Sequence, residues 1–252
     1  MSPNGTPKTV PNDRMIRTVA LADVGRQVKL WKPFLILKYG HDSAHALLEA
    51  LRVVRQKRKA RRGALTDEEQ DLLRAMLVMA ASGLDSMTKQ LIRDALPVFC
   101  RKDPTVLTSF QTFVSRQLKR DADGHLSGET SGLLARLLTA ESVQSASINE
   151  YVESLTGGSL QSTDALFRVV GALGIPHTMI DEDRLKPIFD DRNDIIHGLD
   201  IDFEAPRRNR HSRTMGDMIR ATNWLLLLAE EIYTNCENKL NQVQPTTPPD
   251  GV

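Results

Sequence analysis

One segment in the last third of the chain carries side chains that could do chemistry together. Residues 190–198 read Asp-Asp-Arg-Asn-Asp-Ile-Ile-His-Gly and include Arg192, Asn193 and His197. On a helix, Asn193 and His197 are four residues apart and lie on one face, which the long side chain of Arg192 can reach. The two isoleucines before the histidine are expected to turn into the core and hold this polar set in place.

These residue types suit the cleavage of RNA by its own 2′-hydroxyl group. The reaction needs one group that removes the 2′-OH proton, another that protonates the departing 5′ oxygen, and positive charge beside the phosphorane. Histidine transfers protons near neutral pH because its unperturbed pKa is about 6.5, and arginine binds phosphate through two donors. We therefore assign His197 as acid or base and Arg192 as the phosphate ligand. Asn193 would orient the imidazole or bind a phosphate oxygen.

The Arg-x4-His spacing alone does not identify a site. A second copy, from Arg120 to His125, crosses a Gly/Asp-rich stretch and lacks the asparagine. The extended form RNDIIHG (192–198) at a helix end resembles the Arg-Asn-x-x-x-His signature of the HEPN superfamily (higher eukaryote and prokaryote nucleotide-binding domains). The resemblance is to prokaryotic ribonuclease and toxin members, of the RiboL-PSP-HEPN type or a similar one. Residues 81–97 look like the partner helix of these members, and a long apolar helix follows the motif.

The resemblance implies a helical bundle over about residues 35–240, although its specific part is the seven residues 192–198. It also implies a two-fold dimer and RNA cleavage without a metal or another cofactor. One chain supplies one His197, so a dimer that apposes two motif helices would supply both the base and the acid of a composite active site. Many members are toxins or antiviral defence effectors, which implies control by a regulatory or antitoxin partner protein. Other members have lost activity, so the alternative is a non-catalytic HEPN module that binds nucleotide, RNA or a partner protein.

A purely structural interpretation of the motif also stays open. Arg192 would then pair with a neighbouring aspartate, His197 would cap the C-terminus of its own helix, and the chain would be a helical oligomerisation protein. Acidic residues surround the motif, and we expect them to form a solvated face rather than a Mg²⁺ site. Their charge would repel a phosphate backbone. These residues are Asp190, Asp191, Asp194, Asp200 and Asp202.

RNA affinity would therefore have to come from basic residues elsewhere. Residues 52–62 hold seven basic residues and no acid, and residues 207–213 (RRNRHSR) follow the motif closely. Such runs are most often solvated faces, but the second run is the better placed to contact an RNA backbone. Its candidate RNA-binding residues are Arg207, Arg208, Arg210 and Arg213.

Apolar residues recur at helical spacing along the chain, so we predict an all-α fold, an antiparallel helical bundle of the HEPN type with extra helices. A capping-box pattern at Thr66 and Glu69 starts a long helix, Gly83 marks a bend or a close helix contact within it, and Pro97 is expected to end it. An Asp-Pro pair at 103–104 opens the next helix. The other expected helices cover 41–62, 129–140, 142–155, 163–173, 182–197 and 214–240, residues 33–40 form either a strand or a helix start, and 121–128 form a loop.

Composition places the chain among soluble globular proteins. Its 252 residues are 40% hydrophobic and 26% charged, with a net charge of +1, as in a domain with its own core. Two cysteines cannot form a disulfide framework, and no apolar run reaches the roughly 20 residues that span a bilayer, so we expect a cytoplasmic location and no membrane partner. We divide the chain into an N-terminal lead (1–30), a HEPN-like helical domain (31–241) and a tail (242–252). Within the domain, 98–160 could be an inserted regulatory or partner-binding segment.

Overall fold

A computed structural model of the protein describes residues 29–59, 63–118, 128–206 and 209–243. Within these ranges the regular structure is helical, apart from one isolated antiparallel bridge between Ile201 and Arg210. The predicted all-α fold is thereby confirmed. The helices are α1 (Trp31–Lys57), α2 (Asp67–Lys102), α3 (Pro104–Gln117), α4 (Gly128–Thr139), α5 (Val143–Thr156), α6 (Thr163–Ala172), the short 3-10 helix η1 (His177–Met179), α7 (Glu182–Gly198) and α8 (Met215–Val243).

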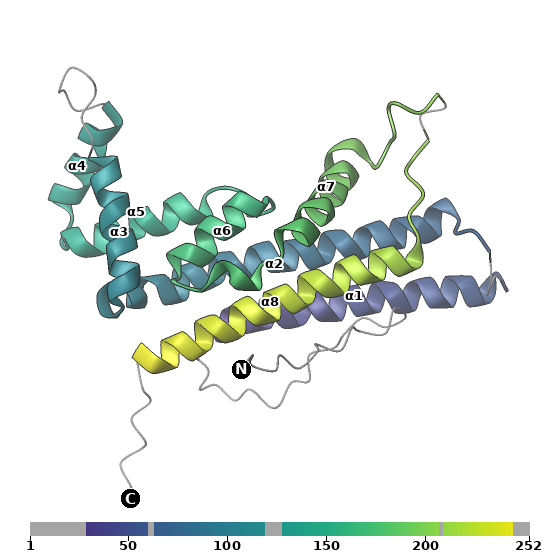
Figure 1. Cartoon of the computed structure of the whole chain (residues 1–252), viewed down its shortest axis with the longest axis horizontal. Coiled ribbons are helices and arrows are strands. Elements are labelled where there is room, and N and C mark those ends of the chain that lie inside the picture. Colours follow the sequence, from purple (N-terminus) through teal and green to yellow (C-terminus); the bar gives the residue numbers. More distant parts are fainter. Residues whose placement is uncertain (1–28, 60–62, 119–127, 207–208, 244–252) are drawn as a thin grey trace, which may run out of the picture.

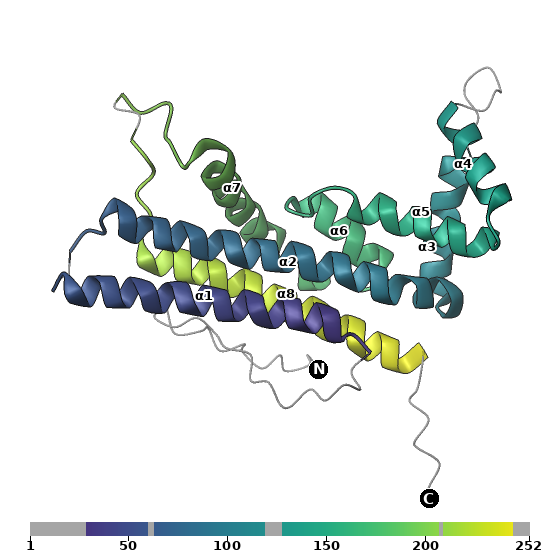
Figure 2. The same ribbon diagram turned by 180° about the vertical axis from the view of Figure 1, so that it is seen from behind.

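The three longest helices, α1, α2 and α8, lie side by side and form an elongated bundle (Figure 1; Figure 2). α1 and α2 are antiparallel. α8 runs in the same direction as α2, because Arg213 just before α8 contacts Gln70 near the start of α2, whereas Lys239 near the end of α8 contacts Asp103 at the end of α2. The chain between α2 and α8 therefore has to return to the end of the molecule at which α2 began.

The centre of the bundle is the apolar side of α2, which is buried along the whole helix. Gly83 of α2 faces Gly40 of α1, and a Cβ atom placed on Gly83 would lie 3.4 Å from the Cα atom of Gly40. The close helix contact expected at Gly83 is thus present. The most deeply buried side chains of α2 include Leu73, Met76, Leu77, Met87, Leu91, Ile92 and Phe99.

Local signals place the start of α2 correctly but not its end. The hydroxyl of Thr66 accepts a hydrogen bond from the amide of Glu69, and the Glu69 carboxylate accepts one from the amide of Thr66, so the capping box is formed. The prediction that Pro97 ends the helix is wrong, since α2 continues to Lys102. Proline removes one helical hydrogen bond, but Phe99 beyond it is completely buried, and this packing keeps the last turns helical.

The N-terminal boundary of α1 settles the alternative left open for residues 33–40. α1 begins at Trp31, so these residues are helical and form the first turns of a 27-residue helix. The strand alternative is therefore wrong. The other helices start and end within a few residues of their expected positions.

α3, α4, α5 and α6 form a group beside the last turns of α2 (Figure 1). The Asp103 carboxylate opens α3 as predicted, because it accepts hydrogen bonds from the amides of the second and third residues of the helix. Lys239 of α8 binds the same carboxylate at 2.9 Å and two carbonyl oxygens of the turn after α6 at 2.9 and 3.0 Å. Segment 98–160 thus includes the end of α2 and all of α3 to α5, and its regulatory role stays a prediction. Most of the expected loop at 121–128 lies outside the described residues.

α7 packs obliquely on α2, and its C-terminal end points toward the end of the bundle at which α2 and α8 begin (Figure 1). This orientation brings the Arg-Asn-x-x-x-His segment close to the start of α2. Across the described ranges, no helix is both long enough and apolar enough to cross a membrane.

Candidate functional site

α7 carries the motif in its last two turns. The helix begins at Asp181, whose carboxylate accepts a hydrogen bond from the amide of Arg184 at 3.2 Å. Two further acids in the first turn interact favourably with the helix dipole. One side of α7 is buried, and this side sets the rotation of the helix and hence the direction of each motif side chain. The buried residues are Leu185, Ile188, Phe189 and Ile195.

Arg192 is half-buried between α7 and α2. Its Nη1 atom donates a hydrogen bond to Oδ1 of Asn193 at 2.9 Å, and its Nε atom is buried without a hydrogen-bond partner. Burial lowers the pKa of Arg192, and the nearby Asp85 carboxylate of α2 opposes this shift. An arginine stays charged at physiological pH all the same. Arg192 forms no ion pair with Asp190 or Asp191, and among the described residues only Asn193 accepts a hydrogen bond from it.

His197 lies on the exposed side of the last turn of α7, and the part of the chain that the structure describes offers it no hydrogen bond. The expectation that both isoleucines turn into the core is wrong for one of them. Ile195 is 8% exposed, whereas Ile196 is 40% exposed. Ile195 lies on the buried side of α7 with Leu185, Ile188 and Phe189, whereas Ile196 lies outside that side. His197 therefore stands beside an exposed apolar side chain.

α7 ends in a left-handed turn, and His197 lies in the last helical turn, so its interaction with the C-terminus of α7 stays open. Leu199 and Asp200 have φ angles of 51° and 62°, a conformation that costs roughly 1–2 kcal/mol for each residue with a Cβ atom. The amide of Asp200 donates to the carbonyl oxygen of Asp194 at 2.9 Å and closes the helix end. Two adjacent strained residues persist only where surrounding contacts determine the conformation.

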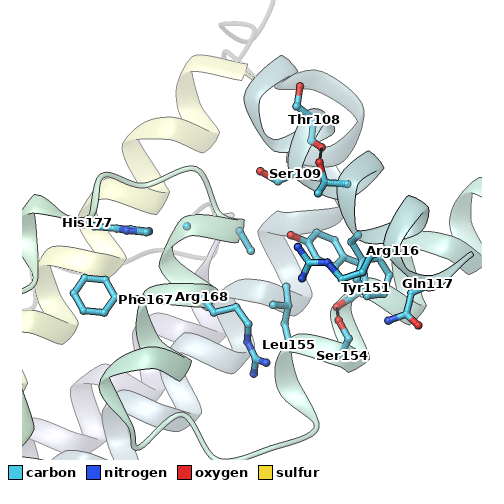
Figure 3. A pocket seen from close by; sticks show the side chains of 14 residues that line it. Thr108, Ser109, Arg116, Gln117, Tyr151, Ser154, Leu155, Phe167, Arg168 and His177 are labelled. Carbon is cyan, nitrogen blue, oxygen red and sulfur yellow. Dashed lines mark hydrogen bonds between the residues drawn. The ribbon is translucent and has the colours of Figure 1, made fainter. Parts of the chain in front are cut away.

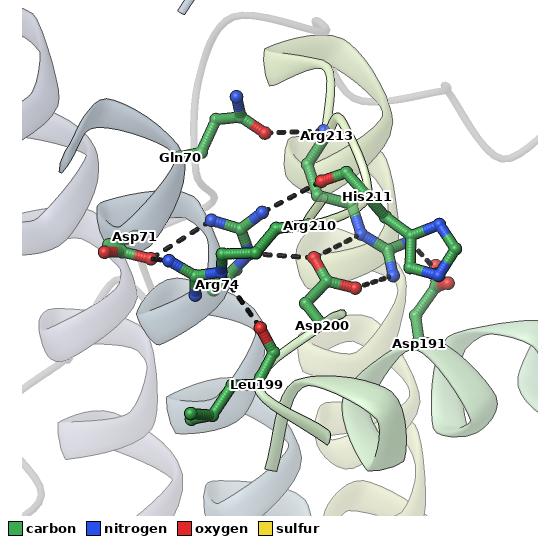
Figure 4. A network of polar contacts seen from close by, with 9 residues as sticks. All are labelled: Gln70, Asp71, Arg74, Asp191, Leu199, Asp200, Arg210, His211 and Arg213. Atoms are coloured by element: carbon green, nitrogen blue, oxygen red, sulfur yellow. Dashed lines mark hydrogen bonds and ion pairs between the residues drawn. The ribbon is translucent and has the colours of Figure 1, made fainter. Parts of the chain in front are cut away.

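Those contacts converge on the carboxylate of Asp200, which is completely buried (Figure 4). Arg213 donates to its two oxygens from Nε and Nη2 at 3.0 and 2.5 Å, and Arg74 donates from Nε at 2.7 Å. Arg213 also reaches Asp191 of α7 at 2.5 Å, and Arg74 donates to the carbonyl oxygen of His211 at 2.9 Å. We call Asp200, Arg74, Arg213 and Asp191 the Asp200 network. It joins the end of α7 to the start of α2 and to the segment before α8.

The Asp200 network corrects the prediction of a uniformly solvated acidic face. Burial would raise the pKa of Asp200, but the hydrogen bonds from Arg213 and Arg74 outweigh burial and lower the pKa below its usual value. The hydrogen bond to Asp200 raises the pKa of Arg213, against burial, and Asp191 adds to the rise. Arg74 was not among the predicted site residues. Its signal in the sequence is a charge inside the apolar stripe of α2, next to Leu73, where a buried arginine requires an acidic partner.

The second basic run is only partly described. Arg207 and Arg208 lie outside the described residues. Arg210 pairs with Asp71 at 2.7 Å and donates from Nε to a carbonyl oxygen at the end of α7 at 2.9 Å, and Arg213 belongs to the Asp200 network. RNA contact by these four arginines stays a prediction. For Arg210 and Arg213 it would compete with the ion pairs within the chain.

A shallow cavity of about 240 Å³ lies beside Asn193, between the start of α6 and α7. Lys186 supplies its positive charge, whereas Asp164, Glu182 and Asp190 supply negative charge. Among the described residues, no group of three or more His, Cys, Asp or Glu side chains is arranged to hold a metal ion. The side chains that could take part in a reaction here are therefore Arg192, the Asn193 amide that accepts its hydrogen bond, and the exposed imidazole of His197.

Comparisons with known protein families, with curated proteins and with solved structures found no match to the chain. The structure brings Arg192 and Asn193 into direct contact and places His197 one turn beyond, at the exposed end of α7.

The Asp200 network predicts a large effect of one charge on stability. We expect Asp200→Asn to lower the free energy of unfolding by about 3–5 kcal/mol at pH 7, because it removes the buried charge that Arg74 and Arg213 share. The matched control is Asp71→Asn, which removes an ion pair to the same Arg74 but at a 52% exposed carboxylate, and it should cost less than about 1 kcal/mol. Urea unfolding of each variant measures both values, and equal costs would contradict the central role of Asp200.

The same network sets the pH dependence. Because folding lowers the pKa of Asp200, its stabilising contribution is complete above the unfolded pKa of about 3.9 and is lost as the pH falls through the folded value. The stability difference between wild type and Asp200→Asn should therefore be constant from pH 5 to 7 and shrink in stronger acid.

Proposed function

We propose that this protein is a metal-independent endoribonuclease of the HEPN type whose active site lies on the last two turns of α7. The observation that carries the proposal is the state of Arg192. Its guanidinium is held by Asn193 at 2.9 Å, lacks an acidic partner on α7, and has a buried Nε atom without a hydrogen bond. A buried donor without a partner costs free energy, and a bound phosphate would remove that cost.

His197 would perform the proton transfers. As base, its imidazole takes the proton of the 2′-hydroxyl while the 2′ oxygen attacks phosphorus. As acid, a second imidazole gives a proton to the 5′ oxygen as the P–O5′ bond breaks. Arg192 would stabilise the charge that grows on the phosphorane oxygens. The products are a 2′,3′-cyclic phosphate and a 5′-hydroxyl end.

Two imidazoles require two chains, so the proposal includes a two-fold dimer with a composite active site. Three large apolar side chains are exposed around the C-terminal end of α7, next to His197: Ile196 is 40%, Leu199 65% and Phe203 64% exposed. Such a group favours a protein contact over free solvent. A second copy that covers it would bring the two α7 ends, and hence both histidines, together.

A nuclease of this kind would act on RNA in the cytoplasm as a toxin or antiviral defence effector. Uncontrolled RNA cleavage harms the cell that makes the enzyme, so this proposal includes a regulatory or antitoxin partner protein. The 98–160 segment, which includes α3, α4 and α5 at one end of the molecule, is the candidate surface for such a partner.

The second candidate is a non-catalytic HEPN module that binds nucleotide, RNA or a partner protein. It is favoured by the charge around the motif. Asp190 and Asp194 are exposed on α7, and the two described arginines of the 207–213 run, Arg210 and Arg213, are already paired with Asp71 and Asp200. Binding without cleavage would distinguish this candidate.

Cleavage of mixed RNA should depend on two side chains of α7. We expect Arg192→Ala and His197→Ala each to lower the cleavage rate at least about 100-fold, because each removes a group that acts in the transition state. Gel analysis of RNA incubated with each variant measures the rate. Circular dichroism checks that the variants remain folded.

Two matched controls test whether cleavage is lost because a catalytic side chain is removed or because any arginine or histidine is removed. Arg184→Ala removes an exposed arginine from the first turn of α7, and His45→Ala removes a histidine from the surface of α1. Both should cleave at the wild-type rate. If folded His197→Ala cleaves as fast as His45→Ala, the assignment of the site is wrong.

The dimer should depend on the apolar group at the end of α7. We expect Phe203→Glu to shift the protein toward the monomer and to reduce cleavage in parallel, because it places a charge in the contact. Leu138→Glu on α4 is the matched control, since Leu138 is 77% exposed and remote in the chain from α7. Sedimentation velocity measures the oligomeric state. A Phe203→Glu monomer that cleaves RNA at the full rate would overturn the composite site.

A further inference from the structure

A second cavity, of about 600 Å³, lies between α3, α5, α6 and η1 (Figure 3). Its volume is within the range of about 300–1,000 Å³ that small-molecule sites occupy. No residue of the Arg-Asn-x-x-x-His motif lines it. We call it the α3–α6 cavity.

The charged side chains of the α3–α6 cavity are basic. Arg116 comes from α3 and Arg168 from α6, and the lining residues within the described ranges include no carboxylate. Neither guanidinium forms an ion pair or a hydrogen bond with any other residue that the structure describes. Unpaired guanidinium groups bind phosphate or carboxylate through two parallel hydrogen bonds, so the cavity suits an anion.

Tyr151 of α5 adds a neutral donor next to this charge. Burial raises the pKa of its hydroxyl to about 12, the Cys100 thiol adds to the rise, and the Arg116 charge works against it. The hydroxyl therefore keeps its proton at neutral pH, and no hydrogen bond from the described part of the chain occupies it. Figure 3 shows the Arg116 guanidinium beside Tyr151. The two groups can donate to one ligand.

The walls of the α3–α6 cavity are aromatic. Phe113 packs against Tyr151 with ring centroids 4.7 Å apart, and Phe167 meets the imidazole of His177 at 5.2 Å. Gly171 makes room for that imidazole, because a Cβ atom there would lie 2.7 Å from its Nε2 atom. Flat ring faces are the surfaces on which planar ligands stack.

We propose that the α3–α6 cavity is a binding site for a nucleoside monophosphate. The Arg116 guanidinium and the neighbouring Tyr151 hydroxyl match the phosphate, Arg168 adds positive charge to the cavity, and the ring faces match the base. The serine and threonine hydroxyls of α3 donate to carbonyl oxygens of their own helix, so their oxygens can accept hydrogen bonds from a sugar. Inorganic phosphate would leave the aromatic walls unused, and an uncharged nucleoside would leave the Arg116 guanidinium unpaired. No residue of α7 lines the cavity, so the ligand is an effector and not the cleaved RNA.

The direct test is isothermal titration calorimetry of the full chain with the 5′-monophosphates of adenosine, guanosine, cytidine and uridine. At least one should bind with one site per chain. Its nucleoside and inorganic phosphate should each bind at least about tenfold more weakly, because each lacks one half of the recognised group. Failure of all four monophosphates to bind at millimolar concentration would overturn the proposal.

Variants locate the bound nucleotide. Arg116→Gln and Arg168→Gln should each weaken binding about tenfold or more, and both side chains are exposed, so the fold is preserved. The matched control is Arg220→Gln at the start of α8, which should bind as wild type does. Arg192→Ala should also retain binding, since the α3–α6 cavity is separate from α7. If Arg192→Ala abolishes binding and Arg116→Gln leaves it intact, the nucleotide binds on α7 and the proposal is overturned. So would an RNA oligonucleotide that binds more tightly than every monophosphate and depends on Arg116 and Arg168.

Discussion

The geometry of the candidate site depends on one buried carboxylate, that of Asp200. It receives three hydrogen bonds from Arg74 and Arg213, and it sits in a left-handed turn that a residue with a Cβ atom adopts only at a cost. Attraction between charges in a poorly solvated interior offsets that cost. Arg74 is on α2 and Arg213 precedes α8, so the carboxylate fixes the end of α7 to both helices. The position of His197, three residues earlier, follows from this attachment.

The Asp200 network also changes the electrostatics that a phosphate would meet at α7. Acidic residues crowd the motif in the sequence, and a fully solvated set would repel RNA. In the structure, Asp200 is paired with both Arg74 and Arg213, and Asp191 is paired with Arg213, so two arginines compensate two of these negative charges within the chain. Asp190 and Asp194 remain exposed. Arg192, held by Asn193 and without an acidic partner on its own helix, is then the positive group that a ligand can reach.

Much of the fold was predictable from the sequence, because its signals are local. The capping box at Thr66 and the Asp103 cap are each contained in three or four consecutive residues, and the contact at Gly83 follows from the absence of a side chain. The course of α2 through Pro97 was not predictable, because the burial that maintains it comes from other helices. The wrong prediction for Ile196 has a similar origin, since the sequence does not say which side of α7 meets α2.

The candidate site was predictable only in part. The motif residues lie within six positions of one another, and the helix brings Arg192 and Asn193 together as expected. Arg74 and Asp200 are separated by 126 positions, so no pattern along the chain connects them. The same holds for the α3–α6 cavity, whose arginines lie on two helices far apart in the sequence. Contacts of this kind appear only when the helices are packed.

The central claim is that α7 carries an RNA-cleaving site that works without a metal ion. The most direct measurement is the chemistry of the ends left on RNA incubated with the wild-type protein in excess EDTA. We expect products with 2′,3′-cyclic phosphate and 5′-hydroxyl ends, in equal amounts with and without EDTA. Products with 3′-hydroxyl and 5′-phosphate ends, or cleavage that EDTA abolishes, would contradict a metal-independent site on α7.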